Sequence, residues 1–165
     1  MFKTKIGISS CLLGNAVRYD GGHKLDHYLR DTFGQFVEWV AICPEVEAGL
    51  SVPREPMQLI TDGIRTRLIT VETGRDQTGT LTRWIGIAMK RLEQERVRGF
   101  VFKARSPSCG VRDTPFFSAA GEIVGERAGV FAEAIMNRFP FLPVEDEERL
   151  RDSRVREEFL QRVQG

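Results

Sequence analysis

The residues best suited to chemistry in this 165-residue chain are three cysteines, Cys11 in SSCLLG, Cys43 in ICPEV and Cys109 in SPSCG. Each lies among Gly, Ser or Pro rather than in an apolar run, where a cysteine that only packs is expected. Thiolates select soft metals such as zinc, copper(I) and iron–sulfur clusters. A shared metal site is therefore one interpretation, and unrelated buried or redox thiols or a nucleophilic cysteine are the others.

Alternating strands and helices must position these thiols. The spacing of apolar residues predicts strands over 5–9, 37–42, 65–71 and 99–103 and helices over 25–36, 80–96 and 127–139. This alternation indicates a single α/β domain, three-layered and Rossmann-like, with a largely parallel sheet. Each cysteine follows a predicted strand, and ligands of such folds bind at the carboxyl ends of the strands. We therefore expect all three thiols to meet at one edge of the sheet.

The cysteine spacing narrows the choice of metal without deciding it. No C-x-x-C pair is present, so the spacings of zinc ribbons and ferredoxins are absent. A structural zinc would need a fourth ligand, which His23 could supply. A cubane iron–sulfur cluster on three thiolates would keep one iron open, as a Lewis-acid catalyst requires.

Composition indicates an ordinary globular chain. The 24 Lys and Arg residues balance 23 Asp and Glu, so net charge gives no argument for nucleic-acid binding. No apolar run approaches the roughly 20 residues of a membrane span, so no membrane partner is expected. An odd cysteine count does not suit a disulfide framework, and a cytoplasmic location fits best. We predict that residues 1–143 form the folded domain and that residues 144–165 form a charged helical tail or linker outside the core.

Three blocks of the sequence, SSCLLGNAVRYDGGHK, ICPEVEAGLSVPREPMQL and FKARSPSCG, resemble the signatures of the TudS family of thiouracil desulfidases. The resemblance runs from about residue 5 to residue 143. It implies a [4Fe-4S] cluster with one open iron, held here by Cys11, Cys43 and Cys109. It also implies removal of sulfur from thiolated pyrimidines such as 2-thiouracil, without net redox change, to leave a carbonyl and sulfide.

The tail adds a second resemblance. LPVEDEERLRDSRVREEFLQRV is similar to the junction at which two-domain relatives of the RudS type continue into a helical domain. Those relatives act on 2-thiouridine in tRNA, so tRNA is an expected partner if the resemblance extends to function. Six basic residues are scattered through the middle of the chain. A solvated surface is the favoured interpretation of them, and a patch that contacts RNA phosphates is the alternative: Arg65, Arg67, Arg75, Arg83, Lys90 and Arg91.

Site residues follow from the blocks. Glu45, two residues after Cys43, is expected to be the general base, as the resemblance also implies, and a carboxylate accepts a proton from water at neutral pH. Ser106 is assigned to proton relay, with Ser108 as the competing choice and as a substrate contact. Charge at a helix start and capping of a turn are the structural alternatives for Glu45 and Ser106.

A polar loop follows Cys11 and is expected to contact substrate. Tyr19 could stack on a pyrimidine, and Arg18 and His23 could meet its carbonyl oxygen or an RNA phosphate. Arg54, in the second block, has the same expected role, and solvent exposure is the alternative for all four. Two other functions remain open: a metal-free cysteine protein for sulfur transfer or redox chemistry, and a zinc-stapled module that binds modified RNA.

Overall fold

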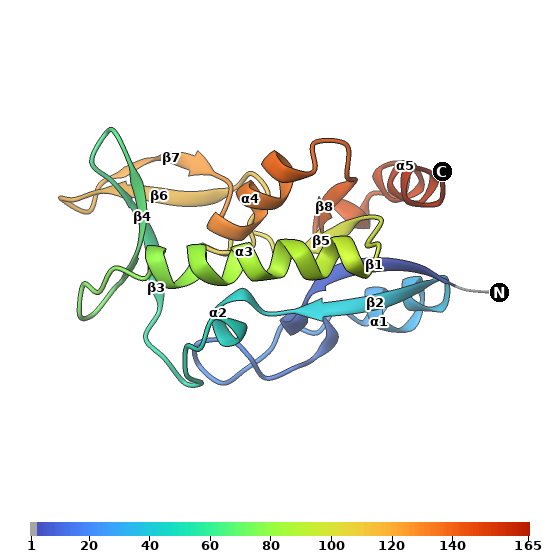
Figure 1. The fold of residues 1–165 in the computed structure, drawn as a ribbon, viewed down its shortest axis with the longest axis horizontal. Helices are drawn as coiled ribbons and strands as arrows, with labels where there is room; N and C mark the ends of the chain where they lie inside the picture. The colour runs from blue at the N-terminus through green and yellow to red at the C-terminus, as the bar shows by residue number, and fades with distance from the viewer. Residues whose placement is uncertain (1–2) are drawn as a thin grey trace.

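The computed structural model describes residues 3–165 and contains a four-stranded parallel sheet, which we call sheet A (Figure 1). Its strands lie in the order β2-β1-β5-β8, and all neighbouring pairs are parallel. The bounds are β1 Thr4–Ser9, β2 Val37–Ile42, β5 Phe100–Phe102 and β8 Val144–Asp146. Because the strands are parallel, their carboxyl ends share one edge, which positions the loops that follow them.

Helices cover both faces of sheet A, which confirms the three-layer arrangement. One face packs against α3 Thr78–Gln94 and α4 Val130–Arg138, and the other against α1 His27–Asp31 and α5 Ser153–Gln164. The alternation of side chains along β5 explains this division. Phe100 and Phe102 belong to the α3–α4 side, whereas Val101 lies in the cluster with α1 and α5.

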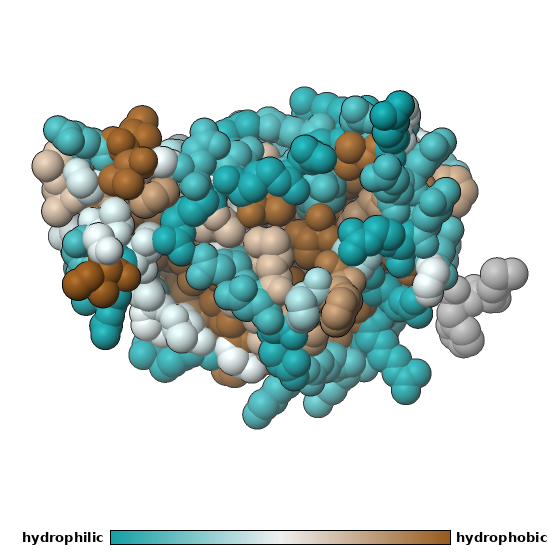
Figure 2. Space-filling model, turned by 90° about the horizontal axis from the view of Figure 1, so that it is seen from above, coloured by the Kyte–Doolittle hydropathy of each residue, from teal (hydrophilic) through white to brown (hydrophobic). Residues whose placement is uncertain are grey.

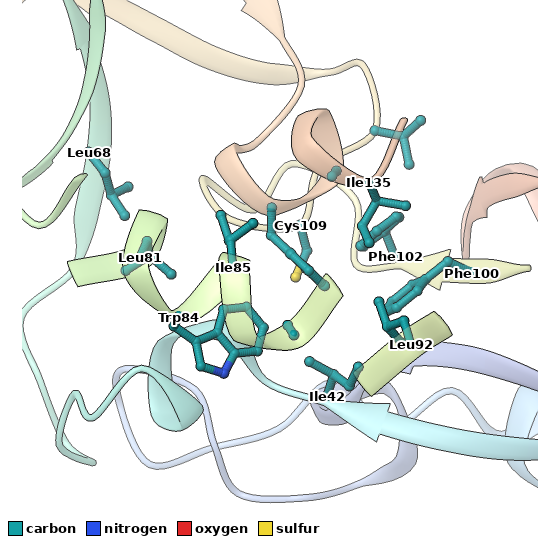
Figure 3. Packing of buried hydrophobic residues seen from close by; sticks show 14 of the residues in the cluster. Ile42, Leu68, Leu81, Trp84, Ile85, Leu92, Phe100, Phe102, Cys109 and Ile135 are labelled. Atoms are coloured by element: carbon teal, nitrogen blue, oxygen red, sulfur yellow. The ribbon is translucent and has the colours of Figure 1, made fainter. Parts of the chain in front are cut away.

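The α3–α4 side holds the larger apolar core. Phe131 of α4 meets the rings of Phe100 and Phe102 edge-on at centroid distances of 5.6 and 5.8 Å. Trp84 of α3 lies 5.0 Å from the ring of Phe131. Figure 3 shows Cys109 among the buried side chains of this cluster. The apolar stripe predicted for α3 is therefore buried, and one of the three thiols lies at the edge of this core.

A second sheet, sheet B, was not expected. It is mixed, with strand order β4-β3-β6-β7, and lies at the other end of α3 from the chain termini (Figure 1). Its bounds are β3 Met57–Thr61, β4 Thr66–Thr70, β6 Thr114–Ser118 and β7 Ile123–Arg127. Figure 2 shows apolar side chains on the surface at this end, where Ile123 and Val124 are exposed. Of its strands, only β4 was predicted, because the others carry no continuous apolar pattern.

The segment from residue 144 onward differs from the tail expected outside the core. It begins with β8, which extends sheet A, and continues through a short 3₁₀ turn, Arg149–Arg151, into α5. Leu150, Phe159 and Val163 are buried against β1 and β5. A Cβ on Gly99 would stand 2.6 Å from Val163, so helix α5 packs directly on the backbone before β5. The segment contains a helix whose apolar side chains complete the core. No helix within residues 3–165 is long and apolar enough to cross a membrane.

Candidate functional site

The three cysteines line one cavity of about 550 Å³ at the carboxyl edge of sheet A. Cys11 lies in the 3₁₀ turn Ser10–Leu13 directly after β1, and Cys43 follows the last residue of β2. Cys109 lies in the loop after β5. All three are free thiols. The convergence expected from parallel strands is therefore present, and the loops that supply the thiols are far apart in sequence.

Burial dominates the chemistry of these thiols. It raises the pKa of Cys11 and Cys43 and raises that of Cys109 well above its usual range. Arg18, hydrogen-bonded to Cys11, opposes the shift there, as does the Ser9 hydroxyl at Cys109. A nucleophilic cysteine needs the opposite shift, towards the thiolate. The surroundings of these thiols are therefore not those of an activated cysteine nucleophile.

The donor set consists of three thiols, the ligand type that holds iron–sulfur clusters. Within residues 3–165 no group of three Cys, His, Asp or Glu side chains is arranged to hold one metal ion. A [4Fe-4S] cluster would be held by thiolates spread around it, so its sulfur ligands would not need to converge on one point. Three free thiols around one cavity provide that kind of ligand set.

The SPSCG loop is fixed by its own polar groups and by close packing. The Ser106 hydroxyl accepts hydrogen bonds from the backbone N–H groups of Ser108 (3.2 Å) and Cys109 (3.1 Å). Gly129, at the start of α4, lies against this turn, since a Cβ there would stand 2.6 Å from the Ser108 carbonyl carbon. Ser106 thus has the capping role, and its own O–H remains available at the cavity that it lines.

Glu45 is held from two sides. It lies on the short helix α2 Pro44–Glu47, directly after Cys43, and lines the cavity. Its Oε1 accepts from Arg54 Nε at 2.9 Å, and its Oε2 accepts from Ser108 Oγ at 2.6 Å. Each carboxylate oxygen has two acceptor positions, so both can still accept one more hydrogen bond.

The residues predicted to contact substrate occupy different places. Arg18 and Tyr19 line the cavity, and the Arg18 guanidinium lies 5.8 Å from the centre of the Tyr19 ring. Arg54 also lines it, but its three nitrogens donate to Glu45, Ser51 and Val17, so it serves to orient Glu45.

Two of these predictions do not match the cavity. His23 is exposed, does not line the cavity, and accepts through Nδ1 from the backbone of Leu25. Ser108 is only 1% exposed and is likewise not a lining residue, since its hydroxyl points to Glu45. Both positions favour local hydrogen bonding over direct contact with a ligand.

Several charged residues of the cavity wall were not predicted from the sequence, among them Lys103 and Glu147. Lys103 follows β5 and Glu147 follows β8, and the ammonium Nζ lies 2.7 Å from Oε2 of the carboxylate. A lysine at the end of an otherwise apolar strand was the available signal for Lys103. No local signal marked Glu147, which lies in the segment interpreted as a charged tail.

With this geometry in place, comparison with known proteins gives the class. Residues 6–147 match the 2-thiouracil desulfurase family, and the chain belongs to that family. It is similar to a solved structure described as the [4Fe-4S]-dependent thiouracil desulfidase TudS, with 34% identity and a TM-score of 0.68. That match covers 91% of this chain and 95% of the other. The uncharacterized protein YbbK of Bacillus subtilis (strain 168) is 31% identical over 108 residues, 62% of this chain and 71% of YbbK.

Proposed function

We propose that this protein is a [4Fe-4S]-dependent desulfidase that converts 2-thiouracil and 2-thiouridine to uracil and uridine. The observation that carries the proposal is the cavity in which three free cysteines and the carboxylate of Glu45 meet. Membership of the 2-thiouracil desulfurase family supports the reaction type, and the similarity to TudS supports the cluster. Free thiols in this number suit a reducing, cytoplasmic compartment.

Cys11, Cys43 and Cys109 would hold the cluster through one thiolate each. When bound, the cluster would supply an open iron that acts as a Lewis acid towards the soft thiocarbonyl sulfur. Arg18, beside Cys11, and the Ser9 hydroxyl, beside Cys109, supply hydrogen bonds around the ligands. Such contacts orient ligand sulfurs and tune a cluster.

Glu45 is the general base in this proposal. The overall reaction replaces C=S by C=O and consumes one water, with hydrogen sulfide as the second product and no change in oxidation state. Glu45 accepts the proton of the attacking water through a carboxylate oxygen that retains a free acceptor position. Arg54 and Ser108 fix the direction of that carboxylate before substrate arrives, which is how positioning lowers a barrier.

Direct contacts with the pyrimidine are assigned to the side chains at the cavity surface. The Ser106 O–H donates to the reacting groups, and Tyr19 offers an aromatic face near the cavity mouth. We include 2-thiouridine within tRNA as a third proposed substrate, to be assayed beside 2-thiouracil and free 2-thiouridine. Arg67 is paired with Asp76, and Arg91 with Glu47 and Glu95, so two of the six proposed RNA contacts are already engaged.

The decisive experiment is anaerobic purification with a visible spectrum, iron and sulfide analysis, and incubation with 2-thiouracil. We expect a brown protein with about four irons per chain that releases equal amounts of sulfide and uracil. A colourless protein that cannot be reconstituted would refute the cluster. It would favour the alternative of a metal-free cysteine protein for sulfur transfer or redox chemistry. A brown protein that is inert towards 2-thiouracil but active on 2-thiouridine or on thiolated tRNA would support the reaction type and change the assigned substrate.

Two variants separate holding the cluster from using it. Glu45→Gln should keep the iron content and lose turnover by at least about 100-fold, the usual contribution of a general base. Cys43→Ser should lose the iron itself. Normal turnover by Glu45→Gln with its cluster intact would remove Glu45 from the role of base.

A further inference from the structure

The Lys103–Glu147 pair lies inside the wall of the cavity that holds the cysteines, and the mechanism above does not use it. The side chains are only 12% and 6% exposed. Removing two charges from water is costly, and a protein retains such a pair only with good geometry and further hydrogen bonds. The surroundings of this pair show what it is arranged to do.

Glu147 acts as a rigid anchor. Its Oε1 accepts from the backbone N–H of Ala104 at 2.7 Å, while Oε2 accepts from Lys103 Nζ. The backbone N–H of Lys103 donates to the Ser9 hydroxyl at 2.9 Å. The strand ends of β1, β5 and β8 are thereby joined around the lysine, so its ammonium has a fixed position at the cavity.

The ammonium group of Lys103 has more N–H groups than acceptors among the described residues. It carries three N–H groups. Among residues 3–165 it has two acceptors, Glu147 Oε2 and the Ala104 carbonyl oxygen at 3.1 Å. By contrast, the guanidinium of Arg54 is committed to Glu45 through Nε, and that of Arg105 is exposed and paired with Glu148. Lys103 is therefore a cavity cation with both a fixed position and a remaining N–H.

We propose that Lys103, held by Glu147, donates this hydrogen bond to the carbonyl oxygen that the thiolated pyrimidine keeps through the reaction. This inference rests on the proposed function and specifies its substrate class. 2-Thiouracil is uncharged, and its C4 oxygen is the strongest acceptor remaining once the sulfur is engaged. Lys103 is thus a specificity residue that selects thiopyrimidines carrying a second, retained oxygen, and Glu147 is its positioning residue.

Pyrimidine-2-thione tests this directly, because it has the same thiocarbonyl but no C4 oxygen. With anaerobic, cluster-loaded protein we expect kcat/KM for 2-thiouracil to exceed that for pyrimidine-2-thione by about 10- to 100-fold, the worth of one charged hydrogen bond. Lys103→Met should lower kcat/KM for 2-thiouracil by about that factor and leave pyrimidine-2-thione unchanged. Equal losses on both compounds would overturn the assignment.

Folding needs its own control, because Lys103→Met leaves the Glu147 carboxylate buried and unpaired. The double variant Lys103→Met/Glu147→Gln removes both charges, and the glutamine oxygen can still accept from Ala104. It should show the same loss of discrimination between the two compounds. Lys3→Met, an exposed lysine just before β1, is the matched control and should keep the wild-type discrimination.

Binding of inert product supplies a readout without turnover. Calorimetry should show uracil binding the wild-type protein about 10- to 100-fold more tightly than pyrimidin-2-one, and Lys103→Met should abolish that difference. If uracil binding depends on Lys103 but 2-thiouracil is not desulfurised, the proposed function fails and the contact stands. If wild type turns over 2-thiouracil and Lys103→Met discriminates as before, only this inference fails. A wild-type protein that neither binds uracil nor turns over refutes both.

Discussion

The hydrogen bond from Ser108 to Glu45 permits a quantitative test of how the base is positioned. The donor–acceptor distance of 2.6 Å lies in the range of a strong, charge-assisted bond between a hydroxyl and a carboxylate. Such bonds contribute about 1.5–3 kcal/mol. If this energy serves only to orient Glu45 in the transition state, Ser108→Ala lowers kcat by about 10- to 100-fold. We expect the lower part of that range, because Arg54 still holds the other carboxylate oxygen.

The assay is sulfide release from 2-thiouracil under anaerobic conditions, with iron content and KM measured on the same preparations. Ser108→Ala should retain its iron and an unchanged KM, because the side chain is buried behind Glu45 and does not line the cavity. Ser153→Ala, an exposed serine at the start of α5, is the matched control. A Ser108→Ala enzyme within twofold of wild-type kcat would refute the reasoning. A kcat loss accompanied by loss of iron would instead show that Ser108 supports the Cys109 loop.

Two further predictions concern the elements around the site. Gly129→Ala should disturb the SPSCG loop, because its Cβ would stand within 2.6–2.8 Å of the backbone of Ser108 and Cys109; we expect reduced iron content after identical reconstitution, and full occupancy would show that the loop adapts. Phe159→Ala should lower the free energy of unfolding by about 3–5 kcal/mol, as for other buried aromatic residues. Urea denaturation followed by circular dichroism measures this, and a loss below about 1 kcal/mol would mean that α5 is not part of the cooperative core.

The fold was predictable where one element follows one simple pattern. The strand over 37–42 was predicted with its observed bounds, and the helix over 80–96 matches α3 Thr78–Gln94 to within two residues at each end. In both, apolar residues are concentrated at buried positions, so the pattern reflects burial. The placement of the cysteines after parallel strands followed from the same alternation and led to the shared cavity.

Sheet B escaped prediction for a physical reason. Strands β6 and β7 are mostly half-buried or exposed, with Pro115 in one and Gly125 in the other, residues that disfavour strand interiors. Their stability comes from pairing with each other and with β3, which is a tertiary effect. Strand β8 is only three residues long and carries two acidic residues, so its sequence resembles a charged linker.

The site was predictable in its residue types but not in its partners. Glu45 and Ser108 are separated by 63 positions and meet only because α2 and the SPSCG loop share one edge of sheet A. The sequence offered Ser106 and Ser108 as alternatives for the proton relay, and it did not indicate that Ser108 is hydrogen-bonded to Glu45. His23 was predicted to contact substrate because it lies in a signature block. In the structure it is exposed and accepts a hydrogen bond from the backbone of its own loop.

The Lys103–Glu147 pair connects the packing of the fold to the site. Glu147 reaches the cavity because β8 adds a fourth parallel strand beside β5, and β8 is followed by α5, whose Phe159 and Val163 pack on β1 and β5. The elements that complete the core on one side of sheet A therefore also place a carboxylate at its carboxyl edge. A change that loosens α5 should reach the cavity through β8 and Glu147, without touching any cysteine. The packing of β8 and α5 on sheet A and the position of the Lys103–Glu147 pair in the cavity therefore depend on each other.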